Sequence, residues 1–467
     1  MLIRLSLLLI FSLNTHAEVT ETKIHGLHKS NVAYALMELD SGKLITSEQV
    51  NKEMILASVS KIFTYYFALK TLGPDFRFNT ELFYLGEIKK GVLKGDLILK
   101  GGGDPYLNAA QLSAFAQHLK LKGIHKIEGR FLVDGSFLQP AQSVSILGLT
   151  DQADNPAISG LNVEFNRYDI WYKELIPYPP VDSLVLKRKN RSAFGLRFNH
   201  KETLGHKEIW EVNTREYIPS VDSIPSKNSS LFTGNYLRLL ASRMGVTLPP
   251  PIEGSTPPKA KLIYTNKGLP FSRIAELGLE FSNNLMAETA LMTAAKKINT
   301  LPQDSKISAE TMMKWYQKSF PDLDWKKVSL INGSGLTIYN EISPLNMVQF
   351  LRALSKQTIE KRSYLSYLSI NGHSGGIRRR LTHPNLGFHI FAKTGSLFYV
   401  NNLAGYLIGK SGKMYAFAFF TTHHKHREVM SGEDSSDKKY LRSKSGEWNN
   451  LSTEAMDSIL EQWIQDY

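Results

Sequence analysis

Hydrophobic and polar positions follow strand spacing near the start of the chain and helix spacing directly after it. Residues 32–39 and 43–46 are two short apolar runs around Asp40-Ser41-Gly42, which predicts a β-hairpin. From Ser58 to Leu72 apolar residues recur at helical spacing, and Gly73-Pro74 ends the pattern. Because this segment is apolar on several faces, we expect a helix buried at the centre of a domain.

A different pattern covers residues 75–261. Short β-prone segments alternate there with turn residues, and prolines cluster at 177–180 and 249–251. We expect a β-rich region of two small domains. The later prolines, together with Pro257-Pro258, would form the connection back to the first part of the chain.

Helical spacing returns after residue 262. It predicts helices over 284–298 and 309–319, then three consecutive antiparallel strands over 388–393, 402–408 and 414–421. The chain ends in an amphipathic helix whose apolar face carries Ala455, Met456, Ile459, Leu460, Trp463 and Ile464. Its polar face is acidic and has no lysine or arginine, which favours burial in the core over a membrane surface. These elements predict an α/β multi-domain fold in which residues 18–74 and 262–467 form one discontinuous domain and residues 75–261 are inserted.

The first 17 residues have the layout of a secretory signal. Arg4 is the basic residue, residues 5–13 are apolar, and Thr15-His16-Ala17 is a cleavage site. The apolar run is shorter than the ~20 residues that a membrane span needs, and no second such run follows. We expect the mature protein to begin near Glu18, to be soluble, and to work in the periplasm without a stable membrane anchor.

Composition narrows the class of protein further. The chain of 467 residues is 42% hydrophobic and 21% charged, which is ordinary for a folded globular protein and excludes a disordered or fibrous one. The absence of cysteine excludes disulfides, thiolate metal sites and cysteine nucleophiles. The net charge of +13 is scattered, and export argues against nucleic acid as a partner, so we interpret the charge as weak attraction to an anionic envelope.

Ser58 and Lys61 lie at the start of the predicted central helix. Residues three apart on a helix share a face, so the lysine amine can reach the serine hydroxyl. A lysine whose pKa is lowered by burial or by another cation can act as the base that activates a serine. Taken alone, Ser58 is more readily explained as a helix N-cap.

Two further short motifs are weak when taken singly. Ser282-Asn283-Asn284 lies between two helical segments and could present a hydroxyl and a carboxamide to a cleft, or simply cap a helix. Lys393-Thr394-Gly395, followed by Ser396, ends a β-prone run. A strand edge there could pair with an extended peptide, the lysine could attract a carboxylate, and the glycine would allow a close approach.

Together the three motifs occur in one order, each in a fitting context, and this set is the signature of penicillin-recognising serine acyl-transferases. The 221 residues from Lys61 to Ser282 exceed what a compact β-lactamase has between these motifs. The chain resembles the penicillin-binding protein 4 type of D-alanyl-D-alanine carboxypeptidase/endopeptidase, a low-molecular-mass class C penicillin-binding protein. Segments 101–107, 161–166, 282–288 and 332–336 also resemble that family.

The resemblance implies a fold and a chemistry. The fold is a penicillin-binding, serine β-lactamase-like transpeptidase domain, with an antiparallel sheet and helices, split by the β-rich insertion. Ser58 would attack a D-alanyl-D-alanine bond or a D,D crosslink of peptidoglycan, with Lys61 as general base. Ser282 would relay the proton to the leaving amine, and Asn284 would hold Lys61 and the substrate amide.

The third motif would bind the substrate. Lys393 would keep Lys61 less protonated and attract the substrate carboxylate, which Thr394 would contact. Gly395 would leave room for the substrate, and the N–H groups of Ser58 and Ser396 would form the oxyanion hole. β-Lactams would acylate the same serine. No metal or organic cofactor is implied, and the motifs leave the oligomeric state open.

Two alternatives use the same fold. A β-lactamase shares the acylation step, but no Glu-x-x-Leu-Asn segment of the class A type is present, and the second motif is Ser-x-Asn rather than Tyr-x-Asn. A non-catalytic cell-envelope binding protein would not require Ser58, Lys61 and Lys393 together. Metal hydrolysis is disfavoured because the one dense histidine group, at 423–426, has the composition of a solvated basic loop.

Overall fold

A computed structural model describes residues 23–171, 173–189, 197–213, 220–299, 304–431 and 436–467. The predicted signal at 1–17 lies outside these residues. Within them, none of the helices combines the length and the apolar character that crossing a bilayer requires.

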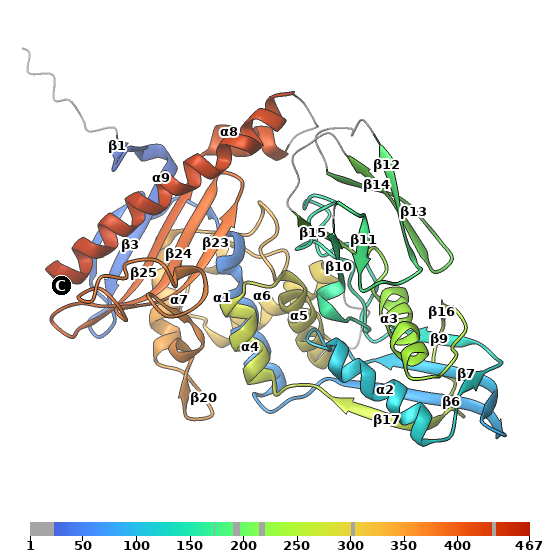
Figure 1. Cartoon of the computed structure of the whole chain (residues 1–467). Coiled ribbons are helices and arrows are strands. Elements are labelled where there is room, and N and C mark those ends of the chain that lie inside the picture. Colours follow the sequence, from blue (N-terminus) through green and yellow to red (C-terminus); the bar gives the residue numbers. More distant parts are fainter. Residues whose placement is uncertain (1–22, 172, 190–196, 214–219, 300–303, 432–435) are drawn as a thin grey trace, which may run out of the picture.

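The first body is built on a six-stranded antiparallel sheet that joins the two ends of the chain (Figure 1). Its order is β22 (Ser369–Ile370), β23 (Ile390–Leu397), β24 (Val400–Ile408), β25 (Met414–Thr422), β3 (Val32–Glu38) and β4 (Leu44–Glu48). The predicted hairpin is confirmed as β3 and β4, and the three predicted consecutive strands as β23, β24 and β25. β3 pairs with β25, so the centre of the sheet joins a strand from the N-terminal part of the chain to one from the C-terminal part.

Helices cover both faces of this sheet because its strands alternate their side chains between two apolar clusters. One face packs on α7 (Pro344–Ser355) and shares a hydrophobic cluster with α1 (Lys61–Leu72), α4 (Phe271–Glu280), α5 (Asn284–Ile298) and α6 (Ser305–Ser319). The other face packs on α9 (Ser436–Asp466), which follows α8 (His424–Ser431), and Figure 1 shows α9 lying across the strands. The apolar stripe of α9 is buried, which confirms its assignment to the core.

Helix α1 lies at the centre of the body, as its pattern predicts. Side chains on all its faces are buried, including Tyr65 and Phe67, which are fully covered. Three helices of the same layer, α4, α5 and α6, pack directly against it. This burial fixes the start of α1, where the predicted lysine lies directly after the turn that carries the predicted serine.

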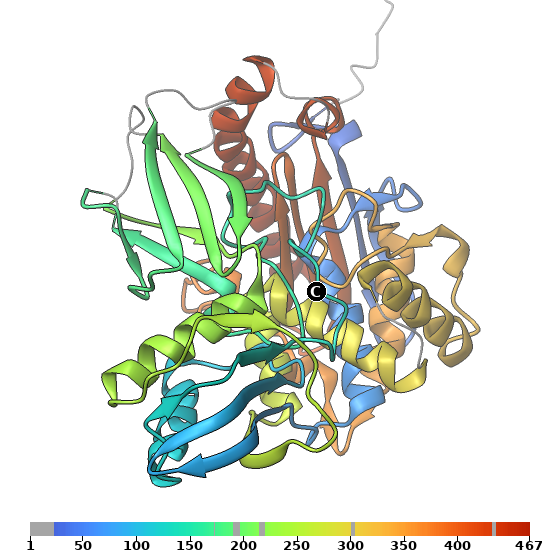
Figure 2. The same ribbon diagram turned by 90° about the vertical axis from the view of Figure 1, so that its right-hand side faces the viewer.

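The region between α1 and α4 contains a second six-stranded sheet and two smaller ones (Figure 2). The larger sheet has the path β16 (Pro251–Glu253), β9 (Phe131–Asp134), β7 (Val92–Gly101), β6 (Asn79–Lys89) and β17 (Lys261–Lys267), with β8 (Lys126–Ile127) beside β7. The smaller sheets are β11-β10-β15 (Ile176–Tyr178, Arg167–Trp171, Val221–Pro225) and β12-β14-β13 (Leu184–Lys189, Lys207–Asn213, Phe198–Leu204).

Two helices of this region, α2 (Ala109–Leu121) and α3 (Ser229–Arg243), are absent from the β-rich prediction. They pack their apolar sides against the sheets in one shared hydrophobic cluster. β17 pairs with β6, so a boundary at residue 262 would cut through a paired strand. We propose that the inserted region instead extends to the end of β17.

Short strands complete the described structure. They are β1 (Lys23–Ile24), β2 (Leu27–His28), β5 (Met54–Ile55), β18 (Val328–Ser329), β19 (Glu341–Ile342), β20 (Thr358–Ile359) and β21 (Arg362–Ser363). β5 pairs with β19. This pairing holds the chain just before the predicted nucleophile against residues 341–342.

Candidate active site

Ser58 lies in a 3-10 turn, Ala57–Ser60, that directly precedes α1. The expectation that it opens the α-helix is off by one turn, and the N-cap alternative is wrong because Ser60 occupies the cap position without a side-chain capping bond. Ala57 adopts a left-handed backbone with φ 48°, an unfavourable conformation that tertiary contacts must maintain. The turn therefore holds Ser58 in a fixed, half-buried position.

Lys61 has three hydrogen-bond acceptors around its amine. Its Nζ lies 2.9 Å from Ser58 Oγ, 2.7 Å from Asn284 Oδ1 and 2.6 Å from the Ser334 carbonyl. A neutral amine has two hydrogens and one lone pair. With the carboxamide and the carbonyl taking the hydrogens, the lone pair faces the hydroxyl of Ser58. The arrangement can therefore take a proton from the serine.

Electrostatics favour this neutral form. Lys61 is fully buried, and burial lowers its pKa well below that of an ordinary lysine, with the positive charge of Lys393 lowering it further. The carboxylates of Glu288 and Asp154 act in the opposite direction. Burial also lowers the pKa of Lys393 to about 7.

The second motif connects the site to the inserted region. Ser282 lies in the loop between α4 and α5 with a left-handed φ of 56°, and Asn284 is the first residue of α5. The Asn284 carboxamide accepts from Lys61 and donates its Nδ2 hydrogen to the Asp154 carbonyl at 3.0 Å. The carboxamide oxygen of Asn284 therefore faces Lys61, and its nitrogen faces Asp154 of the inserted region.

The third motif lies inside β23, not at the end of a β-run as predicted, since the strand continues to Leu397. Lys393 Nζ donates to Ser282 Oγ at 2.9 Å and to the Thr394 carbonyl at 2.8 Å. β22 pairs only with Phe391 and Ala392, so in the described structure the outer edge of β23 has no strand partner from Lys393 onward. A peptide could pair with this edge.

Gly395 is required by close packing between β23 and the Ser58 turn. A Cβ at this position would lie 2.5 Å from the Leu56 carbonyl oxygen and 3.0 Å from the Val59 nitrogen. The glycine thus lets the strand approach the turn, rather than leaving space for the substrate alone. Thr394 is half-buried beside Gly376, and Ser396 is exposed.

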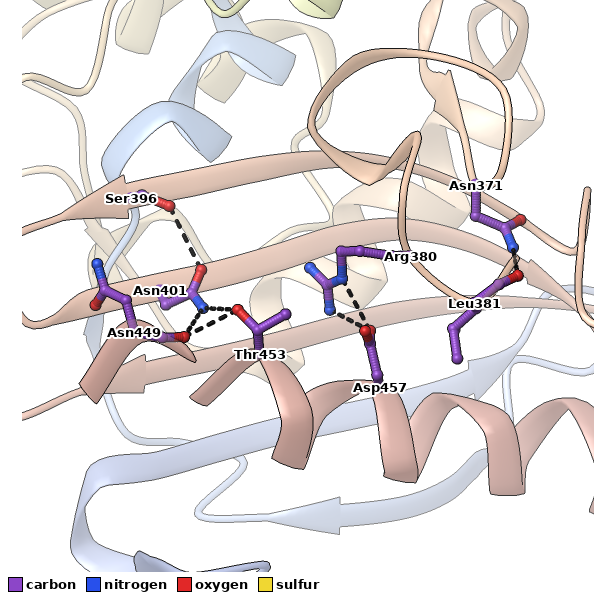
Figure 3. A network of polar contacts seen from close by, with 8 residues as sticks. All are labelled: Asn371, Arg380, Leu381, Ser396, Asn401, Asn449, Thr453 and Asp457. Carbon is purple, nitrogen blue, oxygen red and sulfur yellow. Dashed lines mark hydrogen bonds and ion pairs between the residues drawn. The ribbon is translucent and has the colours of Figure 1, made fainter. Parts of the chain in front are cut away.

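A polar network joins the end of β23 to α9 (Figure 3). Ser396 Oγ lies 3.4 Å from Asn401 Oδ1, and Asn401 Nδ2 donates to the Asn449 carbonyl at 3.0 Å and to Thr453 Oγ1 at 2.8 Å. One helix turn further along α9, Asp457 pairs with Arg380. The outer helix therefore supports the strand that carries the third motif.

Three residues of the site were not given roles from sequence. Ser334 contributes only a backbone carbonyl, and Asp154 comes from a loop of the inserted region without any regular pattern. Glu288 lies one helix turn after Asn284, and this spacing is a signal that it shares the site-facing side of α5. The eight residues predicted for the site lie in three segments: the turn and start of α1, the loop and start of α5, and β23. These three segments contact one another.

A cavity of about 230 Å³ adjoins the second motif, with Asp154, Phe165, Arg167 and Phe281 among its lining residues. A larger cavity of about 640 Å³, between β9, β16 and α5, contains none of the motif residues.

The histidine group at 423–426 differs from the predicted solvated loop. His423 and His426 stack with ring centroids 3.7 Å apart at the start of α8, and His426 packs edge-on against Tyr399. In the described part of the chain, no cluster of three or more metal-ligating side chains is found.

The fold and the three motifs define a serine acyl-transferase in which a buried lysine adjoins the candidate nucleophile, Ser58. The model of the D-Ala-D-Ala carboxypeptidase 3 (S13) family matches residues 14–174 and 217–440, and the chain belongs to this family. It is therefore a serine-type peptidase of the D-alanyl-D-alanine carboxypeptidase class.

Known relatives match most of the chain. The D-alanyl-D-alanine carboxypeptidase DacB of Haemophilus influenzae is 25% identical over 452 residues, covering 88% of this chain and 89% of the relative. The D-alanyl-D-alanine carboxypeptidase of Actinomadura sp. strain R39 is 23% identical over 422 residues, covering 83% and 77%. The crystal structure of penicillin binding protein 4 from H. influenzae superposes with a TM-score of 0.73 at 22% identity, covering 90% of this chain and 96% of that one, which shows the shared fold.

Proposed function

We propose that this peptidase cleaves D-alanyl-D-alanine termini, D,D crosslinks of peptidoglycan, or both, through an acyl-enzyme on Ser58. The observation that carries the proposal is the 2.9 Å contact between Lys61 Nζ and Ser58 Oγ, at an amine whose other two acceptors fix its orientation. A serine becomes a useful nucleophile only when such a base takes its proton.

Acylation begins with the proton of the Ser58 hydroxyl moving to neutral Lys61. Oγ attacks the carbonyl carbon of the D,D bond, and the backbone N–H groups of Ser58 and Ser396 stabilise the oxyanion. Ser58 precedes the N-terminus of α1, whose dipole adds to this stabilisation.

Collapse of the tetrahedral intermediate requires a proton on the leaving amine. The Ser282 hydroxyl, which accepts a hydrogen bond from Lys393, relays the proton that Lys61 took from Ser58 to the amine nitrogen, and the C–N bond breaks. Water then attacks the acyl-serine and releases the shortened peptide, with the proton returning through Lys61. Asn284 holds the amine of Lys61 and the substrate amide during both steps.

Binding uses the free edge of β23. The stem peptide adds as a strand beside Lys393–Ser396, and its terminal carboxylate lies near Lys393 and Thr394. A β-lactam presents a similar carboxylate and a strained amide, so we propose that it acylates Ser58 and leaves slowly. A structure of the H. influenzae relative complexed with a β-lactam supports this proposal.

Location follows from the predicted signal at residues 1–17. We propose that the protein is exported to the periplasm, where peptidoglycan peptides are its partners.

Intact-protein mass spectrometry after incubation with a penicillin tests the proposal. We expect one adduct on the wild type, no adduct on Ser58→Ala, and an adduct on the matched variant Ser60→Ala, whose hydroxyl bonds to the Ala57 carbonyl rather than to Lys61. A D-alanyl-D-alanine peptide should then be hydrolysed only by variants that retain Ser58. Rapid turnover of nitrocefin without an accumulating adduct would favour a β-lactamase instead.

A further inference from the structure

Glu288 is a buried acid that the mechanism above does not use. Its side chain is 1% exposed on α5, one helix turn after Asn284. Oε1 accepts hydrogen bonds from the backbone N–H groups of Gly333 and Ser334 at 3.0 and 2.7 Å, and Oε2 accepts from Ser305 Oγ at 2.6 Å. Both carboxylate oxygens are therefore committed to fixed partners.

Those backbone groups belong to the segment that holds the catalytic lysine. The Ser334 carbonyl accepts from Lys61 Nζ at 2.6 Å, and the Gly333 carbonyl accepts from Thr64 Oγ1 at 2.7 Å. Glu288 thus anchors the segment to α5 while Thr64 anchors it to α1. Without the carboxylate, nothing on the α5 side would hold these two N–H groups.

We propose that Glu288 is the positioning residue for the general base: it holds the Ser334 carbonyl against the Lys61 amine and supplies the negative charge that opposes Lys393. This rests on the proposed role of Lys61. Asn284 and Glu288, four residues apart on one face of α5, then position the same amine, the first by direct contact and the second through the backbone.

The charge gives Glu288 a second effect. A nearby carboxylate stabilises the ammonium form and raises the pKa of Lys61, against the lowering by burial and by Lys393. The other ionisable groups around this centre are Asp154, which acts in the same direction as Glu288, and the buried phenol of Tyr65. A base with too low a pKa accepts a proton weakly, so the acid keeps Lys61 basic enough to act.

Two variants separate position from charge. Glu288→Gln keeps an oxygen that can accept from both N–H groups but removes the charge, whereas Glu288→Ala removes both. Glu310→Gln, on the exposed side of α6, is the matched control for the acid-to-amide change. The measurement is the second-order rate constant of acylation by benzylpenicillin from pH 4 to pH 10, with the thermal unfolding midpoint of each variant.

For Glu288→Gln we expect the acid limb of the pH profile to move by about one unit to lower pH, with a maximal rate reduced several-fold. For Glu288→Ala we expect a loss of at least about tenfold at every pH. Glu310→Gln should match the wild type.

A Glu288→Gln profile that superposes on the wild type would overturn the proposal, even if its unfolding midpoint falls, because a purely structural residue changes stability and not the titration of the base. If Glu288→Ala does not fold, the Glu288→Gln profile decides alone. Absence of acylation in the wild type would instead contradict the proposed function, and the two failures are thereby distinct.

Discussion

At the scale of single residues, the site is unusual in burying two lysines beside each other. A buried cation is costly unless its hydrogens are bonded, and here each amine has defined acceptors. Lys61 contacts three oxygen atoms and Lys393 two. Two positive charges this close together in the interior would be unfavourable. The arrangement therefore favours a neutral Lys61, the form that can act as a base.

Removing the base should reduce acylation without unfolding the protein. For Lys61→Ala we expect the acylation rate to fall by about 10²–10⁴-fold, the contribution typical of a general base. The exposed Lys70→Ala variant on the same helix serves as control and should react normally. Stopped-flow acylation by a chromogenic β-lactam measures both rates, and a Lys61→Ala enzyme that retains its rate would assign the base elsewhere.

The pH dependence has a definite sign. Lys61 can act as a base only when it is neutral. The wild-type enzyme should therefore be acylated at pH values above the pKa of Lys61, and acylation should be lost as the pH falls through that pKa. Because burial and Lys393 lower the pKa of Lys61, this loss should occur well below the ordinary lysine range of about 10.4. An acid limb near pH 10 would show that the burial of Lys61 does not perturb its titration.

Replacing the second lysine should stabilise the fold while impairing function. The folded-state pKa of Lys393 is about 7, below the unfolded value, so the folded state is penalised at and below pH 7, and the penalty disappears as pH rises towards 10. For Lys393→Met we expect a gain of about 2 kcal/mol at pH 7. Urea unfolding at pH 7 and pH 10 checks this, and an equal change at both values would contradict the electrostatic explanation.

At the scale of elements, the decisive contact is between β23 and the turn before α1. Asn402 on β24, the residue paired with Gly395, supports this contact, since its buried carboxamide donates to the carbonyls of Ile55 and Leu56 at 2.6 and 3.1 Å. The turn that carries Ser58 and the strand β23 are thus held together by backbone packing and by one buried side chain.

A methyl group at Gly395 should separate these two elements. Its Cβ would meet the Leu56 carbonyl oxygen at 2.5 Å, so Gly395→Ala must shift the strand or the turn, and we expect acylation to slow by about tenfold or more. Gly446→Ala is the control because its added carbon would meet no atom within 4 Å beyond its chain neighbours and the nearby backbone of its own helix, and α9 should be slightly more stable. Equal acylation rates in the two variants would show that the packing at Gly395 does not position the nucleophile.

At the scale of the whole molecule, the six-stranded sheet joins segments from both ends of the chain. β3 comes from the first 40 residues and β25 from the last 60, and α9 then covers the outer face (Figure 1). The large inserted region contributes Asp154 to the site through its hydrogen bond from Asn284. Catalysis therefore depends on contacts between parts of the chain that are distant in sequence.

The exported protein should lack the first 17 residues. We expect expression of the full chain in a Gram-negative host to yield a periplasmic protein whose N-terminus is at or close to Glu18, because the predicted cleavage site follows Ala17. N-terminal sequencing and intact mass of the periplasmic fraction measure this. A retained leader in a membrane fraction would indicate an uncleaved anchor.

Local pattern was sufficient for several of the elements and for the three motifs. The hairpin, the central helix, α5, the three late strands and the buried stripe of α9 follow from periodicity, because each buries one face and side-chain spacing encodes that face. α2 and α3 were not predicted, since their short apolar patterns lie among many strand-like segments and only packing against the sheets distinguishes them.

The sequence by itself determined which residue types stand at Ser58, Lys61, Ser282, Asn284 and Lys393, and the spacing of the first pair, since three residues of helical chain bring a lysine onto a serine. Only the tertiary structure decided what surrounds that lysine. The Ser334 carbonyl and Asp154 come from segments without a local signal, and the Glu288 carboxylate, although its spacing from Asn284 indicates a shared helix face, reaches the lysine only through the Ser334 backbone. It also placed the third motif within a strand, and it explained Gly395 by the close packing of that strand against the turn that carries Ser58. Burial and long-range contacts set the pKa of a base, and they exist only after distant segments have packed together.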